Sequence, residues 1–291
     1  MLFRFAPVAR IIGLLSLAVA LAGCSAVKLG YNALPDLAYW WLDGYVDLDD
    51  AQGTRVRDEL ARLHAWHRQQ ELPRMLPLLQ RLERMAGSDV TPAQVCALEP
   101  EIRERVQAVR QQLEPAVAAL APTLTPPQLQ HLERKYAQNN RRYTREWVRL
   151  EPPALVDKRM EQITERAETV YGHLEEAQRT LLRQELQQSS FKPSTVLAER
   201  RRRQEDTLQV LRRLSAQPPS QAEALDAVRG VMDRFFASPD PGYRAHLQAQ
   251  REEACRLIAA LHNSATPAQR EAASRRFRSW QRDFVDLASQ Q

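Results

Sequence analysis

The stretch VCALEPEIRERVQAVRQQLEPAVAAL, residues 95–120, decides the fold class. Its apolar residues recur every three or four positions, which is the repeat of one face of an α-helix. They are Val95, Leu98, Ile102, Val106, Val109, Leu113, Val117 and Leu120. This stripe predicts a helix with a single buried face.

The same spacing recurs along the rest of the chain. A second stripe runs from Leu129 to Leu150, and a third keeps a heptad rhythm through Val156, Met160, Ile163, Ala167, Val170, Leu174, Ala177 and Leu181. Alternating runs of β-branched residues, which would indicate strands, are lacking. We therefore predict an all-α protein, an elongated bundle of long amphipathic helices that is partly coiled-coil. A continuous helix over residues 153–188 would be about 54 Å long.

The N-terminus has the form of an export signal. Arg4 and Arg10 precede an apolar run over residues 11–21, which is too short for the roughly 20 residues that span a bilayer. The next residues, Leu21-Ala22-Gly23-Cys24, resemble the bacterial lipobox. That resemblance implies cleavage after Gly23 and a lipid on Cys24. We expect a signal peptide over residues 1–23, a lipid-proximal segment over 24–50 and a single helical domain over 51–291.

The predicted address limits the partners. Ser25 rather than aspartate follows the cysteine, and by resemblance to lipoprotein sorting rules this favours the outer membrane, facing the periplasm, over the inner membrane. The chain has 41 basic and 36 acidic residues, and loss of Arg4 and Arg10 leaves 39 against 36, a net charge of +3. Such a small excess of positive charge in an exported protein argues against a nucleic-acid partner.

Two cysteines remain after Cys24. In an oxidising compartment Cys96 and Cys255 can form a disulfide, and the alternative is two separately buried thiols. His64 and His67 are three residues apart, but no cysteine or carboxylate lies at a spacing typical of a metal site. We find no nucleophile elbow, phosphate-binding loop or zinc-protease motif, and so we expect no enzyme, no cofactor and no metal site.

Basic residues gather on one predicted helix. They are Arg134, Arg141, Arg142, Arg145 and Arg149. This face is either solvated or a binding surface for an anionic envelope component or acidic client. The run of arginines at 200–203 must spread around its helix, and we expect at least one of them to face a neighbouring helix and pair with a carboxylate.

The aromatic segment over residues 39–45, YWWLDGY, lies within about twenty residues of the predicted anchor. Tryptophan and tyrosine favour a membrane interface, and they also serve as core anchors. Both interpretations remain open from the sequence.

A Thr-Pro-x-Gln motif recurs at residues 91–94, 125–128 and 266–269. It is typical of a helix start, because threonine caps backbone amides, proline suits the first turn and glutamine reaches back to the cap. With Leu124 before it, the second copy also resembles the Leu-Thr-x-x-Gln motif of Spy-like periplasmic chaperones.

Several short motifs together resemble a family of Gram-negative lipoproteins of unknown function. They are Lys28-Leu29-Gly30-Tyr31-Asn32, Tyr39-Trp40-Trp41, Asn139-Asn140, Tyr171-Gly172 and the arginines at 200–203. The resemblance covers nearly the whole mature chain and implies no activity. We expect a lipid-anchored periplasmic binding protein, chaperone-like or stress-related, whose partner is an unfolded client or an envelope protein. The alternative is a structural or assembly partner of an envelope complex.

Overall fold

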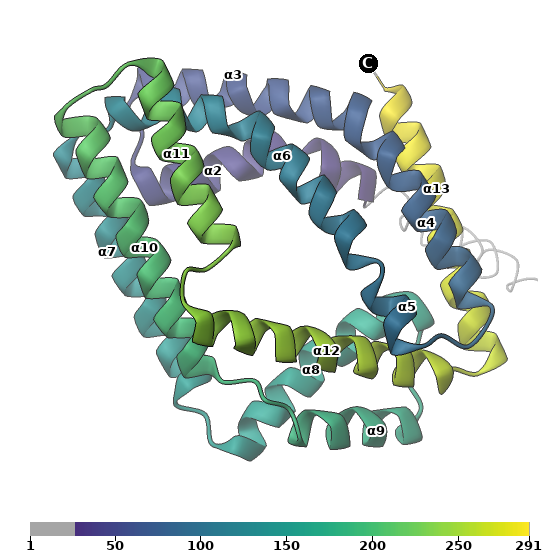
Figure 1. The fold of residues 1–291 in the computed structure, drawn as a ribbon. Coiled ribbons are helices and arrows are strands. Elements are labelled where there is room, and N and C mark those ends of the chain that lie inside the picture. The colour runs from purple at the N-terminus through teal and green to yellow at the C-terminus, as the bar shows by residue number, and fades with distance from the viewer. Residues whose placement is uncertain (1–26, 291) are drawn as a thin grey trace, which may run out of the picture.

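The computed structural model describes residues 27–290, and in this part of the chain every regular element is helical. The all-α prediction, with long amphipathic helices, is confirmed. In Figure 1 the helices form a closed frame, with α2 and α3 along one side and α8 and α9 along the opposite side. The elements are α2 (Leu34–Val46), α3 (Asp50–Trp66), η1 (His67–Glu71), α4 (Leu72–Ala86), α5 (Pro92–Cys96), α6 (Glu99–Leu120), η2 (Ala121–Thr123), α7 (Pro126–Tyr143), η3 (Thr144–Val148), α8 (Pro152–Tyr171), α9 (Glu176–Gln187), α10 (Pro193–Ala216), α11 (Gln221–Phe236), α12 (Pro241–Asn263) and α13 (Pro267–Ser289).

The two halves of the chain repeat the same order of helix contacts. In the first half, α3 packs on α2 and α6, and α2 packs on α7. In the second half, α9 packs on α8 and α12, and α8 packs on α13. Each half also lends two helices to the other, because α4 and α5 pack on α13 and α12, while α10 and α11 pack on α7 and α6. The frame therefore consists of two interlocked halves. In Figure 1 the exchanged helices lie at the right, where α4 runs beside α13, and at the left, where α10 runs beside α7.

Paired helix starts lie at the centre of each half. Gln52 on α3 and Gln128 on α7 donate to each other, with Nε2–Oε1 distances of 3.4 and 2.6 Å. Gln178 on α9 and Gln269 on α13 do the same at 2.8 and 2.9 Å. Each amide also donates to the backbone carbonyl two residues before the partner's N-cap. All four glutamines are buried, and their polar groups are thereby satisfied.

The three Thr-Pro-x-Gln motifs begin α5, α7 and α13, and each forms a capping box. At Thr266, for example, Gln269 N donates to the threonine hydroxyl at 3.2 Å, and the glutamine Oε1 accepts from Thr266 N at 3.0 Å. The interpretation of these motifs as helix starts is confirmed. Nothing in the motif itself indicates that two of these glutamines, Gln128 and Gln269, also join helices across the core.

The continuous helix expected over residues 153–188 is wrong. The helix ends at Tyr171, and Gly172 adopts a φ of +76°, which lies in the region that glycine tolerates best. Glu168 accepts from Leu174 N at 3.1 Å and from Arg179 Nη2 at 2.6 Å, which fastens the turn into α9. Leu174 is 1% exposed, so the turn continues the apolar stripe although it is not helical.

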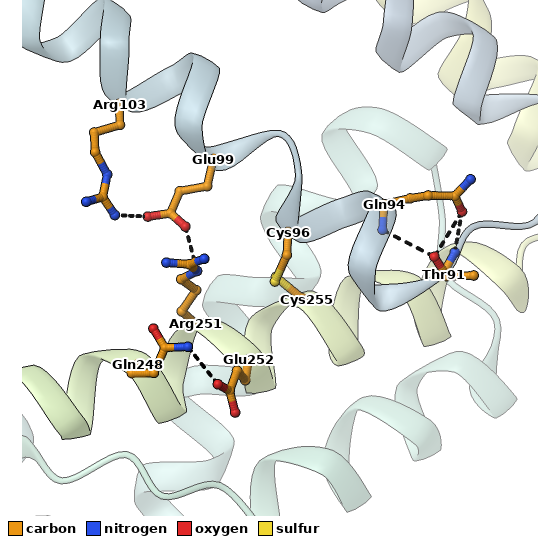
Figure 2. Close-up of a disulfide and its surroundings, with 9 residues drawn as sticks. All are labelled: Thr91, Gln94, Cys96, Glu99, Arg103, Gln248, Arg251, Glu252 and Cys255. Atoms are coloured by element: carbon orange, nitrogen blue, oxygen red, sulfur yellow. Dashed lines mark hydrogen bonds and ion pairs between the residues drawn. A yellow bond between two sulfur atoms is a disulfide. The ribbon is translucent and has the colours of Figure 1, made fainter.

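The disulfide between Cys96 and Cys255 is present, with a Cα–Cα distance of 5.5 Å across 159 residues of sequence. It joins the end of α5 to the middle of α12 (Figure 2). Beside it, Arg251 on α12 bonds Glu99 at the start of α6 at 2.5 Å. Together these links fasten the first half of the chain to the second. The alternative of two separate thiols is thereby excluded.

Within residues 27–290, no helix is both long and apolar enough to cross a membrane.

Candidate functional site

An apolar groove of about 620 Å³ opens between α6 and α11, with α10 along its floor and η1 and α4 at one end. Its size lies within the range of ligand pockets in proteins. The side chains that carry the argument below are Ile102, Val106, Phe235, Phe236, Met75 and Met232.

One wall of the groove is the apolar stripe of α6, for which the sequence predicts a buried face. The stripe on α6 continues into the core at its C-terminal end, where Val117 packs with Ala118 and Ala121 against α11. At its N-terminal end, Ile102 and Val106 are 47% and 45% exposed. The expectation of a fully buried face is therefore wrong for the first turns of α6. These turns face solvent because α11 ends at Phe236 and no other helix covers the stripe there.

The charged groups of the groove are already paired. Arg110 donates to Glu114 at 2.7 Å and to Asp233 at 2.6 Å, so that it joins α6 to α11. Glu71, which is 1% exposed, accepts from Arg74 at 2.9 Å and from Arg105 at 3.2 Å. Because these charges are satisfied within the wall, the groove offers a neutral apolar surface.

One end of the groove coincides with η1, a π-helical turn between α3 and α4. Such turns occur frequently at functional sites. His67 Nδ1 bonds the Tyr31 hydroxyl at 3.0 Å, and His64 Nε2 bonds the Tyr31 carbonyl at 3.0 Å. Burial lowers the pKa of both imidazoles, and the nearby Arg68 guanidinium lowers that of His64 further. The two histidines thus fix the N-terminal segment, and within residues 27–290 no group of three His, Cys, Asp or Glu side chains could hold a metal.

A second hollow, of about 640 Å³, lies between α7–η3 and α10. Three arginines of the predicted basic face, Arg141, Arg145 and Arg149, line it together with Arg201 from α10. All four are exposed, and within the described chain none of them forms an ion pair. Arg145 lies in η3, a second π-helical turn. Two carboxylates, Glu133 and Glu205, also line the hollow, so the four arginines leave it with an excess of positive charge.

The other members of the predicted basic face lie elsewhere. Arg134 does not line the hollow, and Arg142 donates to Asn139 at 3.1 Å on the side of α7 that faces α2. The amide of Asn140 is paired with Gln204 at 2.7 Å, across the floor of the arginine hollow. Spacing along one helix identified three of the four arginines, but Arg201 comes from a helix more than 50 residues later.

The rest of the arginine run is structural. Arg202 and Arg203 both donate to Glu199, a carboxylate that is 4% exposed, with distances of 2.8 Å. Arg202 also donates to the carbonyl of Arg234 on α11 at 2.8 Å. These contacts confirm that part of the run faces a neighbouring helix and is paired with a carboxylate.

Sequence reasoning missed two further copies of the helix-start motif. Residues 48–52, LDDAQ, and residues 174–178, LEEAQ, replace the threonine and proline by acidic residues and still form capping boxes. The signal was an apolar residue, a capping side chain and a glutamine three residues later, which the two segments share with Leu124–Gln128. Aspartate caps helix starts at least as well as threonine does, and the Glu175 carboxylate takes the same place at α9, so the motif does not require threonine.

A model of a family of unknown function, DUF6279, matches residues 44–227. The chain belongs to this family. The match includes α3 to α10, both hollows except the α11 wall of the groove, and the first of the two glutamine pairs. No curated protein and no solved structure matches the chain. Membership in DUF6279 assigns no activity, and the predicted lipid site Cys24, like the rest of residues 1–26, lies outside the described residues.

Proposed function

We propose that this member of DUF6279 is a lipid-anchored binding protein of the periplasmic face of the outer membrane, which holds apolar segments of polypeptides in the groove between α6 and α11. The observation that carries the proposal is a neutral apolar groove whose wall includes half-exposed Val106 and Phe236. Contiguous exposed apolar surface of this kind marks interaction sites in soluble domains.

The dimensions and side chains of the groove favour a polypeptide. The part of the α6 stripe that lines the groove, from Ile102 to Val117, extends over about 22 Å, the length of about four helical turns. Met75 and Met232 line the groove, and methionine adapts its shape to varied apolar partners. Arg105 and Arg110, the arginines that line the groove, are already paired with carboxylates, so neither is available to bind a lipid headgroup.

The test uses the chain from Ser25 onward, which retains every described residue. At stoichiometric ratio it should suppress the aggregation of a chemically unfolded client. Val106→Asp should abolish this effect, because a carboxylate in the groove would have to lose water when an apolar segment binds. Val285→Asp is the matched control, since Val285 is an equally exposed valine on α13 outside the groove.

Four results would count against client binding. The wild-type chain could fail to suppress aggregation, or the two aspartate variants could behave alike. Cross-linking in intact cells could also recover one dominant protein in place of many, which would favour the alternative of an assembly partner. Binding of a fluorescent fatty acid that Val106→Asp abolishes would assign the groove to acyl chains.

The arginine hollow favours a second candidate function, the recognition of phosphate groups on an envelope component. Guanidinium groups bind phosphate in bidentate geometry, and the four arginines outnumber the two carboxylates of the hollow, Glu133 and Glu205, of which Glu133 is paired with Arg212. Calorimetric titration with inorganic diphosphate at low salt should detect binding that Arg145→Ala weakens. Arg166→Ala, at an exposed arginine of α8 outside the hollow, should leave it unchanged, and equal binding by both variants would contradict this function.

A further inference from the structure

One face of α2 is apolar and uncovered. Five of the twelve exposed large apolar side chains in residues 27–290 lie within residues 29–41: Leu29, Leu34, Leu37, Trp40 and Trp41. The four on α2 fall within an arc of about 120° when each residue turns the helix by about 100°. A concentration of this kind on one helix face is the signature of an interaction surface.

The opposite face of α2 fixes the helix to the frame. Tyr39 is 8% exposed, and the Arg57 guanidinium of α3 lies 3.7 Å from the centre of its ring. Val46 is buried with Leu124 and Leu129 at the start of α7. The ring centres of Trp41 and Tyr45 are 4.7 Å apart, so that even the exposed indole is held in place. The outward direction of the apolar face is therefore built into the fold.

The charges of α2 lie away from this face. Asp36 and Asp43 are both about 100° or more from its centre on the helical circumference. Tryptophan and leucine on a helix face that has no charged residue of its own suit the boundary between headgroups and acyl chains, where an amphipathic helix lies in the plane of the membrane.

The position of the face along the chain selects the occupant. Leu29 is five residues from Cys24, so the chain can separate them by no more than about 18 Å. An anchor on Cys24 would hold this face within reach of the bilayer to which its acyl chains belong.

We propose that the exposed face of α2 docks on the surface of the lipid bilayer and orients the frame relative to the membrane. The inference rests on the lipid anchor of the proposed function. It also resolves the two interpretations of the aromatic segment, because Tyr39 serves the core while Trp40 and Trp41, at 66% and 63% exposure, face outward. With α2 docked, the groove and the arginine hollow would each have a fixed orientation relative to the membrane.

The test is fluorescence quenching with the full chain purified from membranes and reconstituted in phosphatidylcholine vesicles whose acyl chains carry bromine. Bromine quenches tryptophans that enter the lipid. The wild-type chain should be quenched, and this quenching should be lost in Trp40→Phe/Trp41→Phe, which removes the reporters while retaining exposed apolar rings. Trp147→Phe is the matched control, because Trp147 lies on η3 between Tyr143 and Phe191, and its removal should leave the quenching intact.

Equal quenching of the wild-type chain and the Trp40→Phe/Trp41→Phe variant would overturn the proposal. So would a dimer in sedimentation that Trp40→Ser/Trp41→Ser dissociates, since a second copy would then occupy the face. Mass spectrometry of the N-terminal peptide tests the anchor separately. A lipidated Cys24 without quenching refutes docking alone, whereas an unmodified Cys24 with quenching refutes the anchor and leaves docking supported.

Discussion

Loss of the disulfide should remove a large part of the stability of this protein. The bond joins Cys96 to Cys255 across 159 residues, and that loop includes the chain from α6 to α11. In the unfolded chain the bond holds the two ends of this loop together, which reduces the entropy gained on unfolding. The change to test is the double variant Cys96→Ala/Cys255→Ala.

The expected loss follows from the length of the loop. For about 160 residues the chain-entropy relation gives about 5 kcal/mol at 25 °C. Single domains have unfolding free energies of about 5–15 kcal/mol, so the loss would be a large share of the total. Loss of side-chain packing should add less than this to the loss of stability. Only Cys255 of the two cysteines is buried, and alanine removes a single sulfur atom while it retains the β-carbon.

Urea unfolding followed by circular dichroism measures this loss directly. The comparison includes the wild-type chain, the wild-type chain with reductant and the double variant. If the covalent link accounts for the stability, the reduced wild-type chain and the double variant should have the same urea midpoint. A loss below about 1 kcal/mol would refute the entropic argument. Peptide mapping that found both thiols free in unreduced protein would refute the bond itself.

Three further predictions concern single residues. Gln128→Ala should lower the unfolding free energy by about 1–3 kcal/mol in urea titrations, because it leaves the buried amide of Gln52 with fewer partners, and Gln94→Ala, an exposed capping glutamine, should cost less. Leu182→Ala should cost about 2–5 kcal/mol by the same measurement, since Leu182 is fully buried beside Met160 and Leu174; a loss below about 1 kcal/mol would contradict its place in the core. Acidification should destabilise the fold, because burial lowers the pKa of His67, so its stabilising effect is present above the unfolded pKa of about 6.5 and is lost as pH falls through the lower folded value. His67→Gln should flatten the change in melting temperature between pH 7 and pH 5, and an unchanged slope would contradict this assignment.

Periodicity predicted the helices well because it reports burial, and burial is what fixes helix faces. Leu129 and Leu132, for example, are both 5% exposed on α7, as their spacing indicated. The break at Gly172 escaped prediction for the same reason: Leu174 is buried in a turn at the position where a helix would also bury it. An apolar stripe predicts that a residue is buried, but it does not predict whether the backbone at that residue is helical.

The binding surfaces depend on contacts between distant segments, and this limited their prediction. Arg141 and Arg145 could be grouped by their spacing on one helix, whereas Arg201 joins them only through the packing of α10 on α7. The groove likewise needs Phe236 from α11, more than 100 residues after the stripe of α6. Local pattern identifies one wall of such a site, and tertiary packing supplies the other.

The interlocked halves have a consequence for how the chain can be divided. If residues 25–150 were made alone, α4 would lack α13 and α7 would lack α10, so the fragment would present two incomplete faces. The missing helices occupy equivalent places in the other half, and a second copy of the fragment could offer substitutes from its own α4 and α7. We expect each half alone to self-associate, and the two halves made together as separate chains to choose each other and rebuild the frame.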